Sequence, residues 1–140
     1  MKTNDQNSHS LENEWCLLQN QFDSYEKFSL LIKLVNTAIL SVAYFSNQLT
    51  IIVIIILLIL WMQDAIWKTF QSRIEIRLLA IETSLNKGEA LKAYQFNFEY
   101  EKNRPGIFGL VKEYLCQAVR PTIAYPHIFL LLVSAYQVFL

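Results

Sequence analysis

The fold of this chain is decided by residues 49–67, which read LTIIVIIILLILWMQDAIW. Residues 51–60 are ten consecutive aliphatic side chains, and together they favour insertion at a bilayer centre by roughly −3 to −6 kcal/mol. A buried strand can be equally apolar, but strands rarely exceed about eight residues. This run lies within nineteen residues that contain no proline or glycine. The stretch therefore predicts a transmembrane helix.

The composition of the whole chain agrees with a small membrane protein. Hydrophobic residues make up 54% of the 140 residues, and isoleucine and leucine gather in blocks. Twelve basic and twelve acidic side chains cancel without a basic cluster, so direct nucleic-acid binding is not favoured. Residues 1–15 carry acids and amides where a secretory signal has a basic segment followed by an apolar one, so we expect residues 1–27 in the mature protein.

Nothing in the sequence favours catalysis. Cys16 and Cys116 lack the spacing of a metal or redox motif, and we expect two reduced thiols. The chain has no GxSxG, HExxH, phosphate-binding loop or paired-carboxylate motif, and it has only three glycines. We therefore expect a protein that is not an enzyme and has no catalytic residue, cofactor or metal.

Residues 1–27 predict an amphipathic cytoplasmic helix, with Ser10 as its N-cap followed by Glu12 and Glu14. Its apolar residues are separated by four, three, four and three positions, which is coiled-coil spacing over about two heptads. These candidate oligomer contacts are Leu11, Trp15, Leu18, Phe22 and Tyr25. The same face also suits a helix that lies on the membrane or packs inside one subunit.

Residues 28–45, FSLLIKLVNTAILSVAYF, predict a first span with a polar stripe. Polar groups at membrane depth are unfavourable facing lipid, so the stripe should face other helices or a water-filled space. The candidate pore-lining residues are Lys33, Asn36, Thr37, Ser41 and Tyr44. The alternative is plain helix packing, with Lys33 reaching toward the membrane surface.

The two spans form a predicted transmembrane hairpin over residues 28–67, with a tight uncharged turn at residues 46–48. Basic residues flank only its open ends: Lys27 precedes the first span, and Lys68, Arg73 and Arg77 follow the second. The positive-inside rule then predicts a multi-pass inner-membrane protein with a cytoplasmic N-terminus.

Residues 68–120 predict a cytoplasmic region that begins as a continuation of the second helix. Apolar residues keep helical spacing until Lys87 and Gly88 supply a basic end and a C-terminal glycine. Within this helix we expect an ion pair between Asp64 and Lys68, one turn apart.

Residues 93–101, AYQFNFEYE, alternate aromatic and polar side chains with a period of two, which predicts a strand. A solitary strand needs a partner for its backbone, although an ordered loop with aromatic anchors is the commoner outcome. The candidate partner segment is carried by Tyr94, Phe96, Phe98 and Tyr100.

The chain ends with a predicted interfacial helix from about residue 107 and an apolar run over residues 121–140. This run is just long enough to cross the hydrocarbon as a third span, but Pro126 should kink it, and a re-entrant segment is the alternative. His127 follows Pro126 and is the candidate gate; the bland alternative is a histidine hydrogen-bonded to a neighbouring helix.

Residues 61–82, WMQDAIWKTFQSRIEIRLLAIE, together with residues 125–127, resemble small multi-span bacterial inner-membrane proteins. Some of these are effectors of antiphage defence. The resemblance implies homo-oligomers that breach the membrane once a partner or signal releases them.

We therefore expect an all-α integral membrane protein whose partners are membrane lipid, other copies of itself and a cytoplasmic protein or signal. Its expected function is an oligomeric pore or membrane-disrupting effector, held closed by cytoplasmic contacts. The alternative is a non-catalytic membrane anchor or accessory subunit that recruits a soluble partner through the aromatic segment.

Overall fold

The computed structural model describes residues 2–88 and 91–139, and every element in these ranges is an α-helix. The all-α prediction is confirmed. Three of the helices are long and apolar enough to cross a membrane. The elements in chain order are α1 (Lys2–Phe45), α2 (Ile51–Lys87), α3 (Phe96–Asn103), α4 (Ile107–Ala118) and α5 (Pro121–Phe139).

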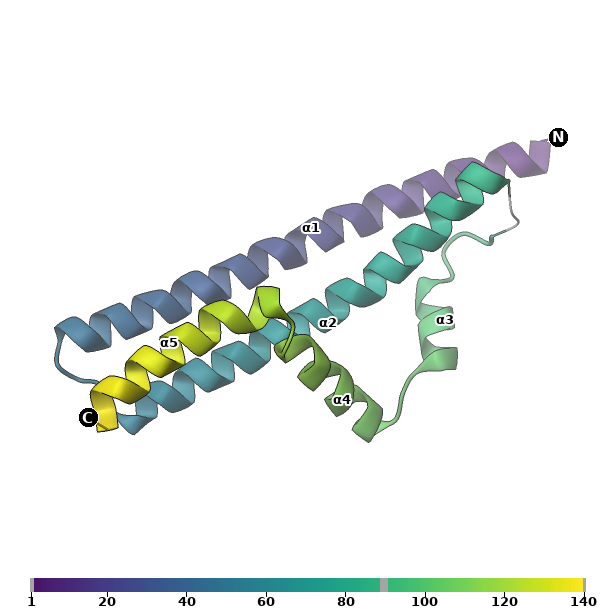
Figure 1. Ribbon diagram of the computed structural model, residues 1–140. Coiled ribbons are helices and arrows are strands. Elements are labelled where there is room, and N and C mark those ends of the chain that lie inside the picture. Colours follow the sequence, from purple (N-terminus) through teal and green to yellow (C-terminus); the bar gives the residue numbers. More distant parts are fainter. Residues whose placement is uncertain (1, 89–90, 140) are drawn as a thin grey trace.

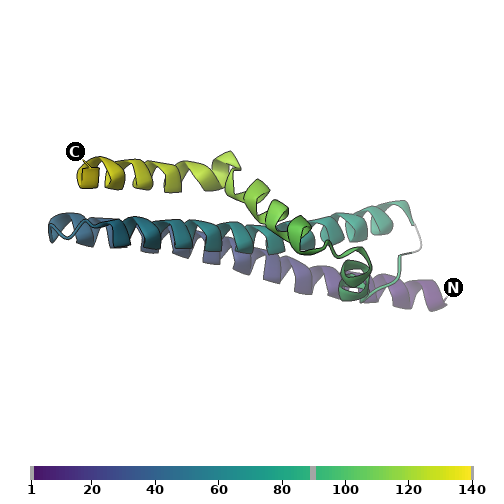
Figure 2. The same ribbon diagram turned by 90° about the horizontal axis from the view of Figure 1, so that it is seen from below.

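The long helices α1 and α2 form an antiparallel hairpin that runs the full length of the molecule (Figure 1). Helix α5 packs along the half that contains the hairpin loop, and the C-terminus ends beside this loop. Helices α3 and α4 lie beside the other half, where the N-terminus is found (Figure 2). The apolar half of the hairpin therefore forms a three-helix bundle with α5, and the two short helices lie beside the polar half (Figures 1 and 2).

Helix α1 has no break between its polar and apolar parts. The expected N-cap at Ser10 is wrong, because the helix already begins at Lys2 and the Ser10 hydroxyl donates to the Gln6 carbonyl at 2.9 Å. The polar residues 6–9 are tolerated because they are exposed, while Leu11 on the other face packs on α2.

Helix α2 continues from its aliphatic run into the polar half without interruption, as predicted. It ends where expected: Gly88 has a φ of 69°, and its N–H donates to the Ser84 carbonyl at 2.9 Å. Glycine adopts this left-handed backbone without the strain that a side chain brings.

The turn between the first two helices is short, as predicted. The Gln48 N–H donates to the Ala43 carbonyl at 2.9 Å, and Asn47 takes a left-handed φ of 52°. Asparagine tolerates this conformation better than most residues. Helix α2 then begins at Ile51.

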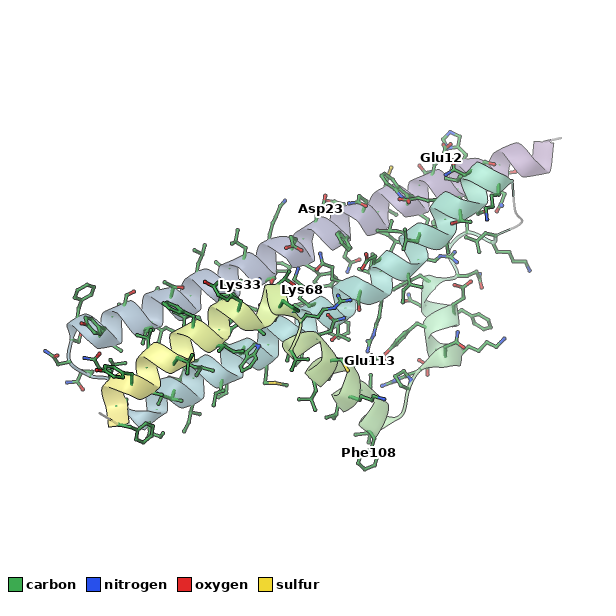
Figure 3. The ribbon with its side chains drawn as sticks, in the orientation of Figure 1. Glu12, Asp23, Lys33, Lys68, Phe108 and Glu113 are labelled. Carbon is green, nitrogen blue, oxygen red and sulfur yellow. The ribbon has the colours of Figure 1, made fainter. Side chains whose placement is uncertain are left out.

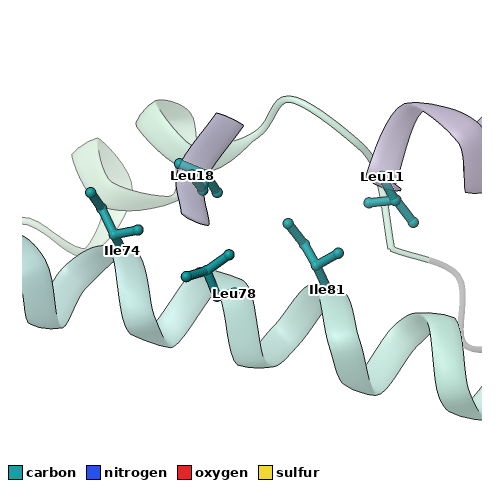
Figure 4. Close-up of a cluster of buried hydrophobic side chains, with 5 residues drawn as sticks. All are labelled: Leu11, Leu18, Ile74, Leu78 and Ile81. Carbon is teal, nitrogen blue, oxygen red and sulfur yellow. The ribbon is translucent and has the colours of Figure 1, made fainter. Parts of the chain in front are cut away.

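The core of the polar half lies between α1 and α2 of the same chain (Figure 4). Leu11 and Leu18 are buried against α2, and the other three members of the predicted coiled-coil seam pack around them. Their partners on α2 are Ile74, Leu78 and Ile81. Burying each such side chain contributes roughly 1.5–3 kcal/mol. Packing inside one subunit, the alternative left open by the sequence, is thus how these residues are used in the single chain.

The predicted strand at residues 93–101 is wrong. Tyr94 has a φ of 59°, which interrupts an extended backbone, and α3 begins at Phe96. No other strand lies in the described residues to pair with it. The backbone instead bonds locally, with the Glu99 N–H donating to the Gln95 carbonyl at 2.9 Å. Because an unpaired strand leaves its N–H and C=O groups without partners, the helix wins.

Helix α5 continues through Pro126 to Phe139. Its 19 residues extend about 28 Å at 1.5 Å per residue, close to the hydrocarbon thickness. Pro121 opens the helix at the position where a missing N–H matters least.

Candidate functional site

Four polar side chains from three helices meet in the apolar half of the molecule. They are Lys33 and Asn36 from α1, Asp64 from α2, and His127 from α5, and we call them the polar cluster. Asn36, Asp64 and His127 are all buried. The cluster brings together two of the candidate pore-lining residues and the candidate gate.

The cluster is connected end to end. The Asn36 Nδ2 lies 2.7 Å from the His127 Nδ1, and the His127 Nε2 lies 3.1 Å from the Asp64 Oδ2. The Lys33 Nζ lies 3.7 Å from the same Asp64 oxygen. His127 is therefore the side chain that joins α5 to both helices of the hairpin.

The hydrogen bonds of the His127 ring are compatible with two arrangements of its protons. An amide N–H from Asn36 requires the His127 Nδ1 to be an acceptor, so the ring proton sits on Nε2 and is donated to Asp64. A half-turn of the Asn36 amide presents Oδ1 instead, which would accept from a protonated Nδ1. The cluster can therefore accommodate His127 either neutral or protonated, with Asp64 as the counter-charge.

All four groups lie at about the same level of the bundle. At 1.5 Å per residue, Asp64 is about 20 Å from Ile51, and Lys33 and His127 are each about 18 Å from the ends of their helices at Phe45 and Phe139. Charged groups at such a depth in an apolar bundle are costly unless they pair. Asp64 lies between the cations of Lys33 and, when protonated, His127.

An aromatic ring covers the cluster on one side. Trp61 stacks on the His127 ring with centroids 6.2 Å apart and an interplanar angle of 16°. Its indole N–H donates to the Ala118 carbonyl at 3.1 Å, where α4 ends. Trp61 thus connects α2 to the junction between α4 and α5 as well as to the cluster.

Several buried polar atoms in and near the cluster have no protein partner in the described residues. They are Asn36 Oδ1, Gln117 Oε1 and Ser134 Oγ, whereas the Ser29 hydroxyl lies beside the Asp64 carboxylate. A buried polar group without a hydrogen bond costs about 1–3 kcal/mol.

The remaining residues of the predicted polar stripe lie elsewhere. Thr37, Ser41 and Tyr44 are exposed on the outer face of α1. The Thr37 hydroxyl donates to the Lys33 carbonyl at 2.9 Å, and the Ser41 hydroxyl donates to the Thr37 carbonyl at 2.8 Å. Bonded in this way, they can face an apolar surround at little cost.

The ion pair expected between Asp64 and Lys68 is wrong. Lys68 instead contacts Glu26 of α1 and the Gln71 Oε1, the latter at 2.8 Å. Asp64 is buried and contacts Lys33 and His127. Lys68 lies beside the middle of α1 (Figure 3). Residues one turn apart on a helix can pair, but here each finds a better partner on another helix.

A second buried network lies in the polar half and was not predicted. The Arg77 side chain, 3% exposed, binds the Glu14 carboxylate with Nε–Oε1 at 2.9 Å and Nη2–Oε2 at 3.2 Å. Its Nη1 lies 3.0 Å from the Glu99 Oε2 of α3, and its Nη2 donates to the Lys92 carbonyl at 2.8 Å. The Tyr94 N–H donates to Glu14 at 2.6 Å. We call this set the Arg77 network.

The neighbours of Arg77 favour its charged form. Burial by itself disfavours the guanidinium, but the hydrogen bonds and charge of Glu14, together with the charge of Glu99, outweigh it and raise the pKa of Arg77. A signal for this network exists in the sequence. Glu14 lies between Leu11 and Leu18 on the apolar face of α1, where a charged residue needs a buried partner.

The four aromatic residues of the candidate partner segment divide into two pairs. Phe96 packs against the core of the polar half, and the Arg73 guanidinium lies 4.7 Å above the Tyr100 ring. Tyr94 and Phe98 are 61% and 69% exposed. Only Tyr94 and Phe98 can contact a partner without rearrangement of α3.

The described residues contain no group of three or more histidine, cysteine or acidic side chains that could hold a metal ion. Cys16 and Cys116 are both exposed and unpaired with each other. Comparison with family models, curated proteins and solved structures finds no match to this chain. The polar cluster and the Arg77 network are therefore the features from which function is inferred.

Proposed function

We propose that the chain is a pore-forming or membrane-disrupting effector of the bacterial inner membrane, working as a homo-oligomer. The observation that carries the proposal is the polar cluster, because ionisable residues inside a set of apolar helices are costly and typically serve ion or proton pathways. In this proposal the monomer described above is the closed state.

In the closed state few hydrogen bonds hold α5 to the hairpin, which suits a gate. Among the described side chains of α5, only His127 forms hydrogen bonds to other helices, at 2.7 Å to Asn36 and 3.1 Å to Asp64. Moving α5 away would expose Lys33, Asn36 and Asp64 to water. The buried polar atoms that now lack partners would gain hydrogen bonds to water, which offsets part of the cost of opening.

Control from the cytoplasm would act through the Arg77 network. This network ties α3 to both long helices, and the exposed Tyr94 and Phe98 lie in or beside α3. A cytoplasmic partner that binds these aromatic residues would compete with the Glu99 contact. We propose that such binding loosens the hairpin and lets subunits associate around the α1 faces that carry Thr37 and Ser41.

The decisive experiment is ion leak from liposomes reconstituted with purified full-length protein. His127→Phe keeps the ring stack on Trp61 but removes both hydrogen bonds, so we expect at least a tenfold faster dissipation of a potassium gradient. Asn36→Leu should act in the same direction. Gln137→Leu is the matched control, since Gln137 is an exposed polar residue of α5 outside the cluster, and its leak should equal that of the parent protein.

A second candidate function is favoured by a separate observation, the exposed Tyr94 and Phe98. In that case the chain is a membrane anchor whose aromatic residues hold a soluble partner, and the cluster only pins α5. The leak assay distinguishes the two. If His127→Phe and Asn36→Leu vesicles remain as tight as empty vesicles while both variants stay folded, the pore proposal fails and the anchor stands.

A further inference from the structure

Helix α4 is amphipathic, but its apolar side faces outward and its polar side faces the rest of the protein. At about 100° per residue, Ile107, Phe108, Val111 and Leu115 fall within an arc of about 120°. This arc faces away from the hairpin: Ile107 is 79% exposed and Phe108 is 93% exposed. Figure 3 shows Phe108 at the tip of α4, pointing away from the other helices.

The polar side of α4 faces the protein. Glu113 accepts from the Arg73 Nη2 of α2 at 2.7 Å, and the Gln117 side chain is turned inward with its Oε1 buried. A helix that packs in water buries its apolar side and exposes its polar side. The opposite arrangement is expected where the surroundings are as apolar as lipid.

The level of α4 along the hairpin indicates whether its apolar face meets water or lipid. The end of α4 at Ala118 is bonded to Trp61, within the apolar run of α2, whose exposed neighbours include Leu58 and Ile59. Its middle, at Glu113, is bonded to Arg73, just beyond that run. Helix α4 leaves the bundle obliquely at this boundary (Figures 1 and 2). The exposed apolar surface of α5 begins at Tyr125, beyond the exposed Arg120, Pro121 and Thr122 at the junction of the two helices.

We infer that α4 is a membrane-embedded wedge: its apolar face lies among the acyl chains of the cytoplasmic leaflet, with Lys112 and Arg120 beside it at the headgroups. The occupant of this face is lipid, because the face lies at the level where the apolar run of α2 ends, basic residues flank it, and its protein-facing side carries Glu113 and Gln117. The inference rests on insertion of α2 and α5 into a bilayer, and it holds for a pore or an anchor alike.

In this position α4 also connects the membrane leaflet to α2 and α5. Through Trp61 and the Ala118 carbonyl it is connected to the ring that covers His127, and through Glu113 it is connected to Arg73. A change in the packing of the cytoplasmic leaflet would therefore act on the start of α5, the helix that carries the candidate gate.

The test is spin-label accessibility in the full chain, in nanodiscs of phosphatidylethanolamine and phosphatidylglycerol. Single cysteines are placed in a Cys16→Ser, Cys116→Ser background at Phe108→Cys and Val111→Cys. We expect collisions with oxygen to be frequent at both positions and collisions with a water-soluble nickel chelate to be rare. Cys16 alone, on the polar half of α1, is the aqueous control.

Ile55→Cys, on the exposed aliphatic face of α2, reports insertion itself. Oxygen contact at Ile55→Cys with nickel contact at Phe108→Cys would overturn the wedge while leaving the spanning helices intact. Nickel contact at both positions would overturn insertion. Low contact with both reagents at Phe108→Cys would show that protein, either a partner or a second copy, covers α4 in place of lipid, and would also overturn the inference.

Discussion

Replacing Arg77 by methionine should release α3 from the hairpin. Arg77 is 3% exposed and all its donors are used: two on Glu14, two on Glu99 and one on the Lys92 carbonyl. Methionine has a similar length but leaves Glu14 buried, with the Tyr94 N–H as its remaining partner in the network. Breaking one side of a buried ion pair costs about 3–5 kcal/mol.

Most of this cost should appear as local opening of α3. The helix has eight residues, which is too short to persist in water once it is undocked. At about 1.4 kcal/mol per tenfold change, a loss of about 3 kcal/mol corresponds to a rise of at least 100-fold in the opening constant. Hydrogen exchange followed by mass spectrometry on peptides covering residues 94–103 measures it directly, in full-length protein held in nanodiscs.

Two further variants separate charge from shape. Arg104→Met removes an exposed pair with Glu101 at 3.9 Å on the same segment, and it should change exchange by less than threefold. The double variant Glu14→Leu, Arg77→Met leaves no buried unpaired charge, because Glu99 is half exposed, and it extends the apolar seam, so it should regain most of the protection. An Arg77→Met variant that exchanges within tenfold of the parent would refute the reasoning. A double variant as open as the single one would show that shape, not charge, holds α3.

Three other substitutions test the packing. Ile81→Ala removes a fully buried side chain from the core of the polar half and should cost about 2–5 kcal/mol in thermal unfolding; a shift in Tm of only a degree or two would mean that the seam is not well packed. Gly88→Ala puts a side chain on a φ of 69° and should destabilise the end of α2 by roughly 1–2 kcal/mol, read as faster exchange at residues 84–88; unchanged exchange would argue against this backbone. Trp61→Phe retains a ring over His127 but loses the 3.1 Å hydrogen bond to the Ala118 carbonyl, so it should lower the free energy of unfolding by about 1 kcal/mol. It should also increase the mobility of a spin label at the start of α5. Unchanged mobility would contradict the link between Trp61 and the α4–α5 junction.

The sequence by itself determined the three long helices α1, α2 and α5 and the end of α2. The aliphatic run 51–60 and the spacing that follows it can form only a long helix, and Lys87 with Gly88 marks its end because glycine alone adopts that backbone freely. The turn at residues 46–48 followed from the absence of any other polar interruption. Periodicity failed at residues 93–101, where alternation over a few residues competes with a helix that satisfies its own backbone.

Tertiary structure alone decided which polar groups meet. Asp64 has a cation one turn away in sequence at Lys68, yet it bonds His127, far along the chain, because α5 folds back onto the hairpin. Likewise Arg77 finds Glu14 and Glu99 through the antiparallel pairing of α1 with α2 and the docking of α3. Helical periodicity assigns a side chain to a face of its own helix, but only the packing of helices brings that face to a partner.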